Sequence, residues 1–359
     1  MRIRRTGLVA VLTGATLALA GCGGGDSGGS AAGGASPATE GGPAAEASDI
    51  RVGLAYDVGG RGDKSFNDAA AAGLDQAKTE LGVEIQELSP NAGGTNRGDN
   101  LRLLAEQGFN PVIAVGFAYA EELPDVAEQS PETSFAIIDD PTVEAENVTN
   151  LLFAEEQGSF LVGAAAALTR PESTSFGYIG GVQTPLLVKF EAGYVAGVQH
   201  VRPGAQVAVR YLTQPPDFSG FNAPDRGREA AQGLLDAGAS VIYAAAGGSG
   251  TGVFQAAVAG DALAIGVDSD QYLTAPPDLQ PVILTSMVKR VDVAVLDFIT
   301  DFSEDDGQVE PGPRTYDLAV EGVGYSTSGG GVDPIVPQLE ELEQQIIAGQ
   351  IKVPTTPQG

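Results

Sequence analysis

Short apolar runs alternate with longer stretches in which apolar residues recur every three or four positions. The short runs predict strands, and the longer stretches predict helices. In the first part of the chain we expect strands at residues 51–56, 83–88, 111–115, 134–138 and 148–153, with helices at 68–81, 97–107 and 120–129 between them. These strands are apolar along almost their whole length, which is typical of a parallel sheet covered by helices on both faces.

The alternation starts again after a long apolar helix predicted at 155–168. It predicts strands at 175–179, 206–211, 240–244, 264–267, 282–287 and 315–318, and helices at 186–201, 226–237, 251–259, 291–302 and 336–347. A chain of 359 residues is longer than one hydrophobic core normally supports. We therefore predict an α/β protein with two doubly wound parallel-sheet lobes.

The last elements are too few for a third domain, so they are expected to return to the first two. We predict an N-terminal lobe of residues 49–155 plus 286–318, and a C-terminal lobe of residues 156–285 plus 319–352. Several chain crossings would then join the lobes as a hinge. Such a clamshell is typical of proteins that close on a ligand in the cleft.

The first 48 residues differ from the rest in composition. A basic start and a short apolar run at 8–19 predict a secretory signal over residues 1–21. Leu19-Ala20-Gly21-Cys22 resembles a bacterial lipobox, in which the cysteine becomes the lipidated first residue. Residues 22–48 are almost all small or polar and predict a flexible tether. A membrane-spanning anchor would give the same location, on the extracytoplasmic face of the cell membrane.

Composition also limits the chemistry. A formal net charge of −28 disfavours nucleic acid as a partner. Cys22 and His200 are the only cysteine and histidine, so neither an intrachain disulfide nor a cysteine–histidine zinc cluster can form. His200 lies near the end of a predicted helix, where it is expected to face solvent or to offset the helix dipole.

Polar and glycine-rich loops follow four of the predicted strands, at residues 56–68, 135–140, 245–250 and 265–271. The carboxyl ends of parallel strands meet at one edge of a sheet, so these loops are expected to line one cleft. The glycine-rich loop at 245–250 does not end in the Gly-Lys-Ser/Thr sequence of a phosphate-binding P-loop. Leu273 and Leu279 stand where a calcium-binding EF-hand loop needs glycine and glutamate. We predict no cofactor and no metal.

Segments 57–67, 184–194, 265–271 and 284–290 resemble the basic membrane protein (Bmp) family of bacterial lipoproteins. The likeness runs from about residue 50 to 350. It implies the type I periplasmic-binding fold and the role of substrate-binding subunit in an ATP-driven (ABC) importer, whose characterised members bind purine nucleosides.

The resemblance also implies ligand contacts. Phe66 and Phe221 would stack on the two faces of the base. Asn67 and Asp139, with Asp57 beside them, would meet the base edge. The ribose side would be formed by Asp268, Lys289 and the backbone of Gly247 and Gly248. The loop at 213–221 is longer and richer in proline than the family pattern, so Phe218 is an alternative to Phe221.

The sequence thus predicts a monomeric lipoprotein that captures a nucleoside and delivers it to permease subunits without catalysis, and the family resemblance implies a purine nucleoside. A secreted nucleoside hydrolase is an alternative, with Asp57, Asp63, Asp68, Asp139 and Asp140 as candidate acids. In another alternative the same receptor fold binds a sugar or a signalling furanose.

Overall fold

The computed structural model describes residues 49–305 and 307–357. The predicted signal peptide at 1–21, the lipidated Cys22 and the tether at 22–48 lie outside the described residues. The described residues belong to one compact unit. Within them, no helix is long and apolar enough to cross a membrane.

The first sheet has six parallel strands in the order β11-β5-β4-β3-β1-β2. Its strands are β1 (Arg51–Ala55), β2 (Glu84–Leu88), β3 (Val112–Ala114), β4 (Phe135–Ile138), β5 (Val148–Phe153) and β11 (Gly312–Tyr316). Its helices are α1 (Phe66–Leu81), α2 (Arg97–Glu106), α3 (Leu123–Gln129) and α9 (Val291–Glu304). Leu74 of α1 packs in one core with alternate strand residues such as Leu54, while Leu104 of α2 packs in the opposite core with Val112.

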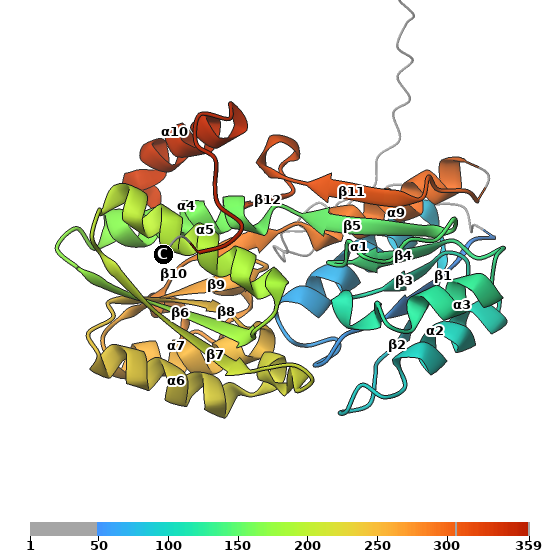
Figure 1. Cartoon of the computed structure of the whole chain (residues 1–359), viewed down its shortest axis with the longest axis horizontal. Coiled ribbons are helices and arrows are strands. Elements are labelled where there is room, and N and C mark those ends of the chain that lie inside the picture. The colour runs from blue at the N-terminus through green and yellow to red at the C-terminus, as the bar shows by residue number, and fades with distance from the viewer. Residues whose placement is uncertain (1–48, 306, 358–359) are drawn as a thin grey trace, which may run out of the picture. The chain divides into compact units, whose positions relative to one another are not determined.

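The second sheet has the order β12-β10-β9-β8-β6-β7, and only β12 is antiparallel. Its strands are β6 (Ser175–Val182), β7 (Gln206–Thr213), β8 (Val241–Ala245), β9 (Leu263–Asp268), β10 (Ile283–Lys289) and β12 (Val323–Tyr325). Its helices are α4 (Glu155–Thr169), α5 (Pro185–Val201), α6 (Pro224–Asp236), α7 (Gly250–Ala259), α8 (Gln271–Thr274) and α10 (Val336–Ile347). Figure 1 shows the two sheets side by side, each between its own helices.

We call each sheet with its helices a half of the molecule. The chain passes between the halves after β5, after β10 and between β11 and β12. These three crossings and the parallel sheets confirm the predicted α/β fold of the type I periplasmic-binding class. The strands are near-continuous apolar runs because helices cover both of their faces.

One predicted boundary is wrong in detail. Residues 286–289 were expected in the N-terminal lobe, but they belong to β10 and pair with β9, as Ser286 does with Gly266 and Met287 with Val267. The buried run that starts at Ile283 continues to Lys289, so the chain leaves the second sheet only after that residue. The division into two lobes that move as units stays a prediction.

Candidate ligand-binding cleft

The loop between β1 and α1 forms one wall of a cavity between the two sheets. Gly59 and Gly62 have φ values of 99° and 108°, which residues with a side chain rarely adopt, and they let the chain turn sharply. The carboxylate of Asp63 accepts hydrogen bonds from the backbone N–H groups of Ser65, Asn67 and Asp68 at 2.9–3.1 Å. These bonds satisfy free N–H groups at the start of α1, so the helix begins at Phe66 with its ring at the cavity.

The cavity is lined from both halves of the molecule. Its walls are formed by Asp57, Val58, Asp63, Phe66, Asn67, Phe117, Asp139, Leu186, Leu187, Phe190, Phe221, Ala245, Gly247, Val267, Asp268 and Lys289. The enclosed volume of the cavity is about 60 Å³, and the empty space is about 560 Å³ once the open mouth is counted. Only the enclosed volume compares with the ~300–1,000 Å³ of small-molecule sites, and it is smaller than that range, so the cleft is narrow in this structure.

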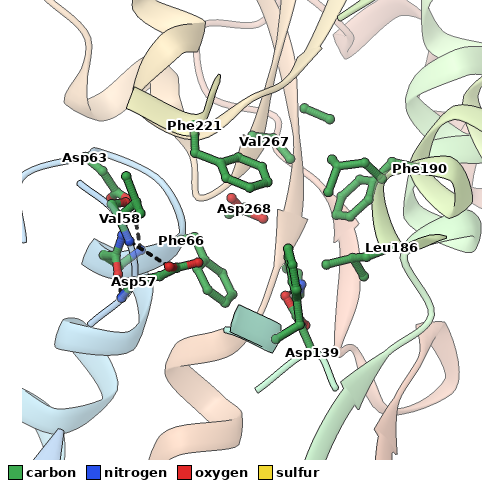
Figure 2. A pocket seen from close by; sticks show the side chains of 16 residues that line it. Asp57, Val58, Asp63, Phe66, Asp139, Leu186, Phe190, Phe221, Val267 and Asp268 are labelled. Carbon is green, nitrogen blue, oxygen red and sulfur yellow. Dashed lines mark hydrogen bonds and ion pairs between the residues drawn. The ribbon is translucent and has the colours of Figure 1, made fainter. Parts of the chain in front are cut away.

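Eight of the nine residues predicted to bind ligand line this cavity, and Gly248 does not. Figure 2 shows the rings of Phe66, Phe190 and Phe221 around one space, with Asp139 and Asp268 at its border. Phe218 is absent from the cavity wall, so Phe221 is the aromatic residue that this loop contributes to it.

Sequence reasoning missed several lining residues, chiefly Phe117, Leu186 and Phe190. Phe117 follows the carboxyl end of β3, so the rule that selected the other four loops could have found it. Leu186 and Phe190 are apolar residues of α5 inside the segment that resembles the Bmp family, but an apolar residue in a helix gives no signal that distinguishes a cleft from a core.

Lys289 is the central cation of the site. Its side chain is 1% exposed, and Nζ lies 2.5 Å from Asp139 Oδ2 and 3.2 Å from Glu155 Oε1. Nζ also lies 5.0 Å from the ring centre of Phe66 and 4.9 Å from that of Phe153. Burial lowers the pKa of Lys289, but the neighbouring carboxylates outweigh burial and raise it above its usual value. The ammonium is therefore fixed and charged.

Asp139 and Asp268 stand at the ends of β4 and β9, and both have left-handed backbone, with φ values of 69° and 65°. Burial raises the pKa of Asp139 to about 7, although Lys289 opposes the shift. Burial likewise raises the pKa of Asp268. Oδ2 of Asp268 accepts a 2.6 Å hydrogen bond from Ser65 Oγ, whereas Oδ1 of Asp139 has no partner among the described residues. Such a buried acceptor is available to a ligand donor.

Asp57 is held by a buried ion pair that the sequence did not reveal. Nη2 of Arg97 lies 3.1 Å from Asp57 Oδ1, and the two side chains are 7% and 10% exposed. Burial raises the pKa of Asp57, and Arg97 opposes that shift. Oδ1 of Asp57 also accepts a 2.7 Å hydrogen bond from the N–H of Val58. Asp57 is thus part of a rigid loop at the cavity wall.

Asn67 takes part in the same loop. Its side-chain oxygen accepts a hydrogen bond from the N–H of Asp57 at 2.9 Å, and its Nδ2 donates to Asp63 Oδ2 at 2.9 Å and to the carbonyl of Val58 at 3.3 Å. Both N–H groups of the amide are therefore used inside the loop. Only the oxygen has an acceptor position left for a ligand.

A larger and mostly apolar cavity adjoins the first. Its volume is about 880 Å³, and it shares Phe117, Asp139 and Leu186 with the smaller cavity. Thr355 and Thr356, near the end of the described chain, stand at its border. Across residues 49–305 and 307–357, no group of three or more His, Cys, Asp or Glu side chains is placed to hold a metal ion.

Two parallel sheets joined by three crossings around a polar and aromatic cleft define a solute-binding protein of the periplasmic type. The crystal structure of an ABC transporter solute-binding protein from Aeropyrum pernix is similar to it, with a TM-score of 0.73 and 31% identity over 85% of this chain and 94% of that one. The family model described as Bmp, an ABC transporter substrate-binding protein that is PnrA-like, matches residues 50–357. This chain belongs to the Bmp family.

Two curated relatives extend the comparison. An uncharacterized lipoprotein of Pyrococcus abyssi is 35% identical over 317 residues, which cover 86% of this chain and 74% of that protein. The ABC transporter nucleoside-binding protein BmpA of Lactococcus lactis is 28% identical over 332 residues, which cover 86% of this chain and 90% of that protein. The relatives are thus named as lipoproteins and as binding proteins of ABC transporters.

Proposed function

We propose that this protein captures a nucleoside in the cleft and delivers it to the permease of an ABC importer. The observation that carries the proposal is the pair of rings, Phe66 and Phe221, which reach one cavity from opposite halves beside buried carboxylates. A nucleoside joins a flat aromatic base to a sugar with several hydroxyl groups. Aromatic rings stack on any base, and carboxylates accept hydrogen bonds from hydroxyl groups.

The proposed pose assigns the base to the space between Phe66 and Phe221. Asp139 is suited to the base edge because its Oδ1 has no partner among the described residues and can accept a hydrogen bond from a ring N–H. Asp57, in the loop before α1, and the free acceptor position of Asn67, in the first turn of α1, lie together at the cavity wall. A purine with a protonated ring nitrogen, such as that of inosine, fits this set of acceptors.

The proposed sugar side consists of Asp268, Lys289 and the backbone around Gly247 and Gly248. Asp268 offers a carboxylate to two sugar hydroxyls, and Lys289 offers an ammonium that donates. Gly247 lines the cavity and Gly248 follows it in η3 (Gly247–Ser249), so the backbone there has no side chains of its own.

The function that we propose is binding without chemistry. Four of the five candidate acids have firm partners: Asp57 pairs with Arg97, Asp63 accepts from the start of α1, and Asp68 and Asp140 accept from nearby backbone N–H groups. Asp139 pairs with Lys289 through one oxygen and keeps the other for a ligand donor. A hydrolase needs an acid or a base that is free to exchange a proton with substrate or water. The proposal includes a monomer, lobes that close as units, and a lipid on Cys22 that holds the protein at the extracytoplasmic face of the membrane.

Calorimetry with a panel of nucleosides tests the proposal. At least one purine nucleoside is expected to bind with a dissociation constant in the micromolar range or tighter. Phe66→Ala is expected to weaken that binding by about 1–3 kcal/mol, because one stacking face is lost. Leu103→Ala, at an exposed position on α2, serves as the control and should leave binding unchanged.

Two outcomes would contradict the proposal. One is the absence of heat from every purine nucleoside while a sugar binds, in which case Phe66→Ala should have little effect on affinity. The other is the release of free base when the protein is incubated with inosine, which would indicate a hydrolase.

A further inference from the structure

Phe218 lies in the loop after β7 but does not line the ligand cavity. It begins η2 (Phe218–Asn222), and Phe221, three residues later, lines the cavity. The ring of Phe218 packs edge-on against the ring of Phe117, with centres 5.7 Å apart and planes at 71°. Its ring centre also lies 5.7 Å from the guanidinium carbon of Arg97. Both geometries are favourable for aromatic and cation–π contacts.

These contacts join the two halves of the molecule. Phe218 belongs to the second half, whereas Phe117 follows β3 and Arg97 begins α2 in the first half. Phe117 is itself a wall of the ligand cavity, and Arg97 is the residue that holds Asp57. Phe218, which is half-buried and outside the cavity wall, therefore touches one residue that lines the cavity and one that supports its wall.

The loop that carries Phe218 is rigidly built on the second sheet. The hydroxyl of Thr213 donates to the carbonyl of Asp217 at 2.6 Å, and the hydroxyl of Ser249 donates to the carbonyl of Gly220 at 2.7 Å. A Cβ at Gly220 would come within 2.0 Å of the carbonyl oxygen of Gly181, so only glycine fits there. The loop can thus present Phe218 to the other half in one fixed position.

Arg97 is equally fixed on its own side. It is buried, donates from Nη1 to the carbonyl of Gly94 at 3.3 Å, and faces the ring of Tyr119 with 5.8 Å between guanidinium carbon and ring centre. A Cβ on Gly94 would lie 2.1 Å from Arg97 Nη1. The guanidinium thus lies between Asp57 and Phe218, where it cannot move without disturbing both.

We propose that Arg97 and Phe218 are positioning residues for ligand capture. Phe218 closes the cleft by packing on Phe117 and Arg97, and Arg97 couples the carboxylate of Asp57 to that closure. Removal of Phe218 leaves every wall of the cavity in place but weakens the closed arrangement, so bound ligand escapes faster. The link to ligand escape rests on the proposed nucleoside function, whereas the closing contact itself does not.

The experiment measures dissociation and association rates of inosine by stopped-flow with the full-length chain. Phe218→Ala is expected to raise the dissociation rate roughly tenfold and to leave the association rate within about twofold. Phe218→Tyr keeps the ring and should stay within about twofold of the unchanged protein. Phe218→Leu keeps bulk without a π face and should fall in between. Leu273→Ala removes an exposed apolar side chain from α8 and is the matched control.

Hydrogen exchange of the ligand-free protein tests closure without any ligand. Phe218→Ala is expected to raise amide exchange in residues 116–120 and 217–222, while Leu273→Ala leaves both segments protected. If inosine does not bind the unchanged protein, the nucleoside proposal fails for this probe. The contact of Phe218 with Phe117 and Arg97 is then tested by amide hydrogen exchange alone.

Coupling to Asp57 is tested with Arg97→Lys, which keeps the charge but loses the flat guanidinium. The double variant Arg97→Lys with Phe218→Ala should dissociate inosine no faster than the faster single variant, since both changes break one contact. If the double variant dissociates inosine faster than either single variant, by the product of the two single effects, the coupling between Arg97 and Phe218 is contradicted. A dissociation rate within about twofold for Phe218→Ala, together with unchanged exchange, would overturn the closing role of Phe218.

Discussion

Three carboxylates surround one ammonium at the base of the cleft. Lys289 contacts Asp139 and Glu155, and Asp268 lies close enough to raise its pKa further. Glu155 is shared, because Lys189 Nζ lies 2.6 Å from its second oxygen. Buried charges are costly unless they are paired, so a surplus carboxyl tends to hold a proton. For Asp139, burial and the nearby carboxylates Glu155 and Asp268 outweigh the contact with Lys289 and raise the pKa, and Oδ1 has no partner among the described residues.

The affinity for inosine is expected to fall about tenfold from pH 8 to pH 6. Burial raises the pKa of Asp139 to about 7, so its carboxyl gains a proton over this range and stops accepting from the N–H of the base. The facing groups Lys289, Glu155 and Asp268 remain in place. Calorimetry at several pH values checks the effect.

The isosteric variant Asp139→Asn is the control for this pH dependence. It cannot titrate, so its affinity should be lower at pH 8 and nearly constant down to pH 6. An affinity of the unchanged protein that is flat from pH 8 to pH 6 would contradict the role of Asp139 at the base edge.

At the scale of elements, the packing of α4 against α5 positions the site. Cβ atoms added to Gly193 and Gly197 of α5 would lie 2.1 Å and 2.0 Å from carbonyl oxygens of α4, so the two helix backbones nearly touch. Glu155 opens α4, and Leu186, Leu187 and Phe190 lie in the first turns of α5. The close approach of the helices therefore places Glu155, the partner of Lys289, beside the apolar residues of α5 that line the cavity.

Gly197→Ala is expected to destabilise the protein by about 1–3 kcal/mol, because an added methyl group overpacks the contact between α4 and α5. Gly233→Ala is the matched control. Gly233 lies in α6 with nothing within 4 Å of an added Cβ, so alanine there should stabilise the protein by about 0.5–1 kcal/mol. Denaturant unfolding measures both changes. Equal effects of the two substitutions would contradict the close helix contact.

At the scale of the whole molecule, acidic charge dominates. The chain has 47 Asp and Glu residues against 19 Lys and Arg, and most ion pairs away from the cleft are exposed and contribute little. Mutual repulsion of surface carboxylates opposes the compact state, and salt screens it. A salt-rich habitat and simple solubility are the two hypotheses for this surplus.

The melting temperature is expected to rise when sodium chloride is increased from about 0.05 M to about 1 M, because the Debye length shrinks from more than 10 Å to about 3 Å. The double variant Glu340→Gln with Glu343→Gln removes two neighbouring acids of α10; burial, and after it repulsion from Glu340, raises the pKa of Glu343. It should melt higher than the unchanged protein at low salt and respond less to added salt. A melting temperature independent of salt would exclude self-repulsion as a significant factor.

The sequence predicted much of this molecule because its signals are local. Apolar runs that alternate with helical periodicity are sufficient for two parallel sheets, since the pattern reflects burial on both faces of each strand. The helix at 336–347 and the strand ends that carry Asp139 and Asp268 were found in this way. The motif segments were specific enough to indicate the Bmp family, which the family model confirms.

Only the tertiary structure decided how distant residues meet. Which of Phe218 and Phe221 lines the cavity depends on the fold of one loop, in which Gly220 packs against Gly181. The partnership of Arg97 with Asp57 joins residues 40 positions apart, and its contact with Phe218 joins the two halves. A linear pattern records which faces of an element are buried. It does not record which other elements cover them, because that depends on the packing of the whole chain.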